Sequence, residues 1–198
     1  MSKDFFNLRA ATWDEKVAEK DLSRLKAIAD RLDINPGAAV LDVGTGTGVF
    51  VPFLLDKIKS AGELVCLDFA EEMLKITRSK GFKGNIRYLC ADIENNHLTD
   101  KSFDAVVCYS VFPHFRDKLK ALKEINRLLR EEGLVFICHT SSRQAINEIH
   151  RNIPEVYDHI LPGNGDMHQM LSEAGFEDIC INDGKDDYLV CARKPSDE

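Results

Sequence analysis

The sequence of 198 residues lacks the features that mark several specialised classes of protein. No apolar run approaches the ~20 residues that a membrane-spanning helix needs. Basic residues are fewer than acidic ones, 26 against 33, and the net charge of -7 argues against a protein that binds nucleic acid through a basic surface. The first residues also lack the basic-then-apolar order of a secretion signal. We therefore expect a cytoplasmic protein that binds neither nucleic acid nor membrane.

The six cysteines form no C-x-x-C pair, so the sequence gives no sign of a zinc site. Each cysteine lies in or beside an apolar, strand-like stretch, which is typical of reduced thiols in a cytosolic core. We expect six free, buried thiols and no metal ion. The residues are Cys66, Cys90, Cys108, Cys138, Cys180 and Cys191.

Internal repeats and low-complexity segments are absent too, and the spacing of apolar residues predicts alternating helices and strands. A helix is expected over 14–32, and the breaker INPG ends it. Strands are expected over 38–44, 62–70, 86–92, 103–110, 134–140, 177–183 and 187–194, and further helices over 49–60, 70–81, 117–132, 142–153 and 166–176.

The five strands that end by residue 140 are continuous runs rich in Val, Ile and Leu, which is typical of parallel strands covered on both faces. The turn GKDD joins the last two strands, so we expect these two to be antiparallel. The predicted fold is a doubly wound α/β sheet of seven strands, mostly parallel, with a C-terminal antiparallel hairpin and helices on both faces. Ligands of such sheets bind beyond the carboxyl ends of the strands.

The segment VLDVGTGTGVF, residues 40–50, carries a glycine-rich loop directly after the first predicted strand. Val49 stands where a dinucleotide-binding loop has its third glycine, and no Gly-Lys-Ser/Thr follows as in a P-loop. Asp42 precedes the loop, and its carboxylate would repel a pyrophosphate but suits a cationic amino group. A tight turn without a ligand is the alternative. The glycines are Gly44, Gly46 and Gly48.

Acidic residues also end the second and third predicted strands. Asp68 is placed to accept both ribose hydroxyls of a nucleoside, and Phe69 to cover one face of its base. Asp92 can accept a hydrogen bond from the amine of adenine, while Ile93 covers the other face. Taken alone, Asp68 has a helix cap as its alternative role, and Asp92 has that of an ordinary turn residue. Together with the loop, they indicate a ligand with an amino acid end, a ribose and an adenine, which describes S-adenosylmethionine.

These segments resemble the class I S-adenosylmethionine-dependent methyltransferases, most of all a small ubiquinone-biosynthesis-like subgroup with a methyltransferase type 11 domain. The resemblance covers residues 40–137 and rests on VLDVGTGTG, LDFAEEML, CADIE, FDAVVCYSVFPHF and INRLLREEGLVFI in this order. It implies a Rossmann-like fold, S-adenosylmethionine as cofactor and transfer of its methyl group. The cofactor-binding positions that it implies are Asp42, Gly44, Thr45, Gly46, Gly48, Asp68, Phe69, Asp92, Ile93, Tyr109 and Ser110.

The resemblance leaves the methyl acceptor open. The chain has no basic extension for RNA and no Asn-Pro-Pro-Tyr motif after the fourth strand, which favours a small-molecule acceptor. His114 and then His139 are the candidate general bases, with Tyr109 on the side where the methyl group leaves. A surface position is the alternative for His114. Four of the six histidines, His139, His150, His159 and His168, lie between the end of the fifth strand and residue 170, but without metal-ligand spacing such as H-x-x-x-H.

We expect a single domain over 1–198, in which 1–35 is an N-terminal helical cap or lid, 36–140 the cofactor-binding core, and 141–198 a substrate-side insert, a helix and the terminal hairpin. Phe5, Phe6 and Trp13 would form the apolar side of a lid, and Arg9 would meet an anion; a plain cap packed on the sheet is the alternative.

A catalytically inactive sensor or partner subunit that binds S-adenosylmethionine is the alternative to an enzyme. Val49 and Asp42 speak against a dinucleotide-dependent oxidoreductase. The oligomeric state cannot be predicted.

Overall fold

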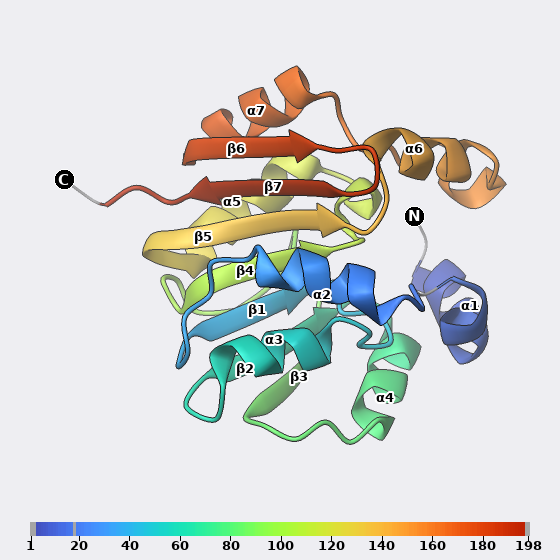
Figure 1. Ribbon diagram of the computed structural model, residues 1–198, viewed down its shortest axis with the longest axis horizontal. Coiled ribbons are helices and arrows are strands. Elements are labelled where there is room, and N and C mark those ends of the chain that lie inside the picture. The colour runs from blue at the N-terminus through green and yellow to red at the C-terminus, as the bar shows by residue number, and fades with distance from the viewer. Residues whose placement is uncertain (1–2, 18, 197–198) are drawn as a thin grey trace.

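The computed structural model describes residues 3–17 and 19–196 (Figure 1). Its strands are β1 (Ala39–Val43), β2 (Glu63–Asp68), β3 (Ile86–Cys90), β4 (Phe103–Tyr109), β5 (Leu129–His139), β6 (Glu177–Asp183) and β7 (Tyr188–Arg193). Its helices are α1 (Lys3–Lys16), α2 (Leu22–Asp30), α3 (Val51–Ile58), α4 (Glu71–Ser79), α5 (Lys118–Leu128), α6 (Arg143–Arg151) and α7 (Asn164–Glu173), with short 3-10 helices η1 (Phe112–His114) and η2 (Pro154–Val156).

The described strands form one seven-stranded sheet in the order β3-β2-β1-β4-β5-β7-β6. Neighbours from β3 to β5 pair in parallel, and β7 pairs antiparallel with both β5 and β6. This order confirms the predicted doubly wound sheet with an antiparallel C-terminal hairpin. Because the strand order reverses between β1 and β4, the loops that follow these two strands border one crevice.

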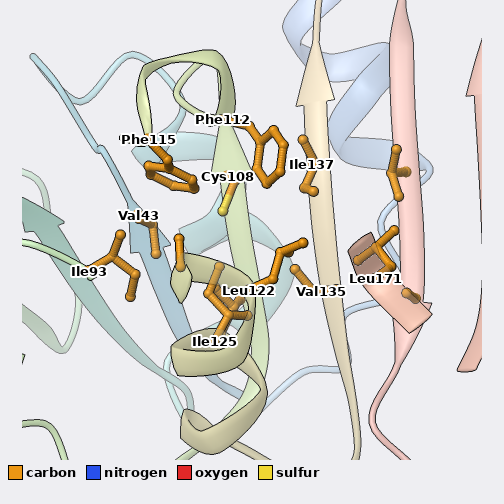
Figure 2. Close-up of a cluster of buried hydrophobic side chains, with 14 of the residues drawn as sticks. Val43, Ile93, Cys108, Phe112, Phe115, Leu122, Ile125, Val135, Ile137 and Leu171 are labelled. Carbon is orange, nitrogen blue, oxygen red and sulfur yellow. The ribbon is translucent and has the colours of Figure 1, made fainter. Parts of the chain in front are cut away.

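Hydrophobic layers cover both faces of the sheet, because side chains alternate along each buried strand. Val40 and Val107 face the layer that contains α2 and α3, whereas Leu41 and Val106 face the layer that contains α5 and α7. Figure 2 shows part of the second layer, where side chains of α5 pack against β4 and β5. Each buried aliphatic side chain contributes about 1.5–3 kcal/mol, so the two layers hold the strands firmly beneath the loops.

The predicted helix over 14–32 is wrong, because the structure has two helices there. α1 ends at Lys16, and α2 begins only at Leu22; residue 18 lies outside the described residues. The Asp21 carboxylate accepts a hydrogen bond from the backbone N–H of Ser23 at 2.9 Å. This N-cap satisfies an amide at the start of α2, so it favours a new helix over a continuous one.

The predicted helix over 117–132 is also too long. α5 ends at Leu128, and β5 begins at the next residue. Leu128 and Leu129 are both fully buried, and Leu129 pairs with Phe103 of β4. A helix cannot bury both successive side chains and also supply this sheet pairing. Gly133 therefore lies within β5 and does not follow the end of a helix.

The expectation of six buried thiols holds for half of them. Cys66, Cys108 and Cys138 are buried in the central strands. Cys90 and Cys180 are exposed because β3 and β6 are the two edges of the sheet, and Cys191 is partly buried. All six are free thiols. None of the helices in the described ranges combines the length and the apolar character that crossing a bilayer requires.

Candidate functional site

A cavity of about 300 Å³ lies at the carboxyl ends of β1, β2 and β4. The loop after β1, the loop after β3, η1 and the inner side of α1 complete its wall. Of the sequence-predicted residues, Gly44, Thr45, Gly46, Asp68, Phe69, Asp92, Ile93, Tyr109, Ser110 and His114 line this cavity. The structure thus brings together four segments that are far apart in the sequence.

The loop after β1 needs glycine for two reasons at Gly44. Its backbone has φ +68°, a conformation that side-chain-bearing residues rarely adopt. A Cβ there would also lie 2.2 Å from Cγ2 of Val111, which follows β4. The loop therefore passes so close to the end of β4 that a side chain does not fit, and the Gly44 N–H donates to the carbonyl of Leu67 at 2.7 Å.

The Asp68 carboxylate connects the loop to the end of β2. One oxygen accepts from the Gly46 N–H at 2.8 Å, and the other accepts from the Ala70 N–H at 2.8 Å. Burial raises the pKa of this carboxyl to about 6. A carboxylate offers about four acceptor positions, so Asp68 retains capacity for a further donor beside these backbone N–H groups. Asp68 is therefore both a local cap and an available acceptor on the cavity wall.

Asp42 lies beneath the loop at the end of β1 and does not line the cavity. Its side chain accepts a hydrogen bond from the Thr45 hydroxyl, and Thr45 does line the cavity. Burial, together with the nearby charge of Asp68, raises the pKa of Asp42 to about 7. Gly48 also lies outside the cavity wall, where a Cβ would approach Cγ2 of Thr77 at 2.6 Å.

The loop after β3 contributes Asp92 and Ile93 to the cavity wall. One Asp92 oxygen accepts from the Glu94 N–H at 2.9 Å, and the other lies 3.4 Å from the Arg116 guanidinium. The Glu94 side chain accepts from the Arg116 N–H at 2.7 Å and so ties this loop to the segment after η1. Sequence reasoning missed Glu94 and Arg116, because neither stands in a motif whose chemistry is specific.

α1 lies over the cavity, where Phe6 and Trp13 contribute to its wall. The Phe6 ring lies 5.5 Å from that of Phe69 and 5.4 Å from that of His114. α1 thus packs against the cavity wall and α4, and its role as a lid stays a prediction. Arg9 meets an anion of the chain itself, because its guanidinium pairs with Glu155 of η2 at 2.8 Å.

A second tie runs from α1 to the glycine-rich loop. The Asp14 carboxylate accepts a hydrogen bond from the Thr47 hydroxyl and pairs with the Lys80 ammonium at 2.7 Å. These contacts lower the pKa of Asp14 against the opposing effect of burial, which is the largest single influence. α1 therefore contacts the loop after β1, the end of α4 and η2.

The three predicted catalytic side chains lie around two cavities. His114 lines the large cavity, and burial followed by the neighbouring His150 and His159 lowers its pKa well below the usual value. His139 lines a smaller cavity of about 150 Å³, and burial lowers its pKa to about 3. Tyr109 lines both cavities, and its hydroxyl lies 3.2 Å from that of Thr140. Across residues 3–17 and 19–196, no cluster of His, Cys, Asp and Glu has the geometry to hold a metal ion.

Comparison with known proteins finds relatives over the segment that contains the cavity-lining loops. The family model of the methyltransferase domain matches residues 41–137. The ubiquinone/menaquinone biosynthesis C-methyltransferase UbiE of Idiomarina loihiensis is 30% identical over 151 residues, which are 71% of this chain and 60% of that protein. The UbiE protein of Shewanella sp. strain ANA-3 is 29% identical over 187 residues, covering 80% of this chain and 74% of that protein.

The fold has solved counterparts as well. A SAM-dependent methyltransferase from Aquifex aeolicus superposes with a TM-score of 0.75 at 20% identity, covering 98% of each chain. Family model, relatives and fold agree with the order of the motifs along the chain and with the cavity that they line. The chain belongs to the class I S-adenosylmethionine-dependent methyltransferase family, with S-adenosylmethionine as its cofactor.

Proposed function

We propose that the chain transfers the methyl group of S-adenosylmethionine to a small-molecule acceptor, with the cofactor in the large cavity and the acceptor beside Tyr109, Ser110 and His114. The observation that carries this proposal is the arrangement of one cavity wall. The glycine-rich loop, the Asp68 carboxylate and the Asp92 carboxylate lie along it, and it continues to an uncharged imidazole at His114.

The residues present fit the cofactor. The close approach of Gly44 to Val111 leaves bare backbone where the methionine end would lie, and Asp68 retains acceptor positions for ribose hydroxyls. Phe69 and Ile93 offer apolar contact to the adenine, and Asp92 offers an acceptor for its amine. Asp42 acts through Thr45, and its negative charge favours the cationic amino group.

When bound, the cofactor supplies a methyl group on a positively charged sulfur, ready for in-line displacement. The chain positions the acceptor and keeps water away with Phe6 and Trp13 of α1. The pKa of His114 is depressed, so its imidazole is neutral at neutral pH and can accept a proton. Beside His114, the wall includes the apolar side chains of Phe6, Val111 and Phe115, which favours an acceptor with an apolar part.

Two measurements test this function. Calorimetric titration with S-adenosylhomocysteine is expected to show binding, and the same titration with NAD none. Methyl-labelled S-adenosylmethionine, incubated with a panel of phenols, quinols, amines and thiols, should then transfer label to one class, identified by mass spectrometry. Binding of NAD in place of S-adenosylhomocysteine would refute the proposal. Cofactor binding with no transfer to any class would favour the inactive sensor.

The affinity for S-adenosylhomocysteine is expected to fall as the pH falls. Asp42 and Asp68 have pKa values raised to about 7 and about 6, and their ionised forms are the ones that favour the amino group and the ribose hydroxyls. Binding therefore lowers both pKa values, so affinity is greatest above pH 7. It weakens as the pH drops through 7 and 6, by up to about tenfold per pH unit for each group. Calorimetry at pH 8, 6.5 and 5.5 measures this, and two buffers of different ionisation enthalpy reveal proton release on binding below pH 7. An affinity that is the same at all three values contradicts the assignment of both carboxylates.

A further inference from the structure

Three histidines from separate segments meet at one end of the large cavity. His114 comes from η1, His150 from α6, and His159 from the loop after η2. Nδ1 of His114 lies 3.0 Å from Nδ1 of His159, and the rings of His114 and His150 are 4.9 Å apart. A hydrogen bond between two ring nitrogens requires one protonated and one bare nitrogen, so the tautomers of His114 and His159 are linked.

The contacts around His159 indicate which ring nitrogens of His150, His159 and His114 carry a proton. Nδ1 of His150 contacts the backbone carbonyl of His159, and a carbonyl only accepts, so this nitrogen carries a proton. Nε2 of His159 lies 3.7 Å from the carboxylate of Asp158, and that negative charge favours a proton on Nε2. Nδ1 of His159 is then bare and accepts from Nδ1 of His114. The lone pair of His114 is consequently on Nε2, on the ring that lines the cavity.

The surroundings of His114 disfavour its doubly protonated, charged form. Burial opposes its charged form most strongly, and the groups that face it, His150, His159, His139 and Lys118, oppose it further. His159 has direct access to solvent, since its side chain is 14% exposed and that of the adjacent Asp158 is 66% exposed. The charge of Asp158 raises the pKa of His159 against the stronger effect of burial. A proton on the pair is therefore better held at His159.

We propose that His114 and His159 form a proton relay from the acceptor to solvent, with Asp158 as the residue that positions the tautomer of His159. This rests on the proposed function. The acceptor's lone pair forms the new bond to the methyl carbon, and the carbon–sulfur bond breaks with its electrons remaining on sulfur. The acceptor's proton passes to Nε2 of His114, and the Nδ1 proton of His114 passes to Nδ1 of His159. His159 then loses a proton to solvent, and exchange with water restores both tautomers after product release.

The test reads the tautomers directly and needs no acceptor. Two-bond proton–nitrogen correlation spectra of protein with ¹⁵N-labelled histidine, saturated with S-adenosylhomocysteine at pH 7.5, report which ring nitrogens carry a proton. We expect His114 to be protonated on Nδ1 and bare on Nε2, and His159 the reverse. A proton on Nε2 of His114 overturns the relay. Absence of S-adenosylhomocysteine binding overturns the proposed function instead, so the two failures are distinguishable.

Variants separate a relay from a merely structural cluster. Asp158→Asn removes an exposed charge and is expected to lower the pKa of His159 and raise the share of the opposite tautomer at His114. His168→Gln replaces an exposed histidine of α7 and is the matched control for His159→Gln. It should change neither the pKa of His159 nor the tautomer of His114. With the acceptor class found as above, His159→Gln is expected to lower kcat about tenfold with KM unchanged, a part of the usual acid–base contribution. An unchanged His114 tautomer in Asp158→Asn, or an unchanged kcat in a folded His159→Gln, contradicts the relay.

Discussion

Replacing Asp68 by alanine is expected to lower the affinity for S-adenosylhomocysteine by about 100-fold or more. Two hydroxyl donors to an ionised carboxylate contribute roughly 1.5–3 kcal/mol each, and every 1.4 kcal/mol is about a factor of ten in affinity. The substitution also releases the N–H groups of Gly46 and Ala70, so the loop after β1 loses its side-chain tie to β2 and keeps only backbone hydrogen bonds such as that from Gly44 to Leu67. Isothermal titration calorimetry at pH 8, where the carboxylate is ionised, gives the affinity.

Two further variants serve as comparisons for Asp68→Ala. Asp68→Asn retains the shape of the side chain but has only one acceptor oxygen, so it should fall between the parent and the alanine variant. Asp56→Ala removes an exposed carboxylate that pairs with Lys59 at 2.8 Å, far from the cavity wall, and should bind as the parent does. An affinity in folded Asp68→Ala equal to that of the parent would remove Asp68 from the site.

Gly44→Ala is expected to cause the largest loss of stability among the loop substitutions. The left-handed backbone costs about 1–2 kcal/mol for alanine. The added Cβ would lie 2.2 Å from Cγ2 and 2.6 Å from Cβ of Val111, and such overpacking costs about 1–3 kcal/mol more. For a chain of this length, the melting temperature should fall by roughly 5–15 °C. Cofactor binding should be lost, because the backbone can relieve the clash only by moving the loop.

Gly81→Ala is the matched control for this substitution. Gly81 has φ +63°, nearly the same as Gly44, but nothing lies within 4 Å of the position of its Cβ. Only the backbone cost applies there, about 1–2 kcal/mol, with no effect on the cofactor. Val111→Ala in the Gly44→Ala background removes the two γ carbons but leaves Cβ, so it should recover part of the stability. Equal melting temperatures for Gly44→Ala and Gly81→Ala would mean that the close approach to Val111 has no consequence.

The sequence was a reliable guide wherever the physical cause was local or periodic. Buried parallel strands are continuous apolar runs, so the parallel, doubly wound character of the sheet followed from the pattern. Asp68 was identifiable because it stands at a strand end, a fixed distance after Gly48. The junction between α5 and β5 was missed because the pairing of Leu129 with Phe103 is a tertiary contact that helical spacing conceals.

The partner of His114 could not be predicted for a similar reason. His159 follows η2 in a segment without apolar periodicity, and its distance from His114 depends on the path of the chain between α6 and α7. The sequence likewise did not show that Asp42 is buried away from the cavity wall. Its position before the loop does not reveal that Thr45 lies between it and the cavity. Motifs therefore identified residues of the cavity wall better than they identified the neighbours of His114.

The contacts of α1 have a kinetic consequence. The same helix contacts the loop after β1 through Asp14, the wall beside Phe69 through Phe6, and η2 through Arg9. With the cofactor in the cavity as proposed, we expect these three contacts to slow its dissociation for as long as they persist. Residence time then depends on the lifetime of these contacts and not only on equilibrium affinity. We expect the enzyme to exchange its cofactor slowly, and its turnover to be paced by the opening of the N-terminal helix.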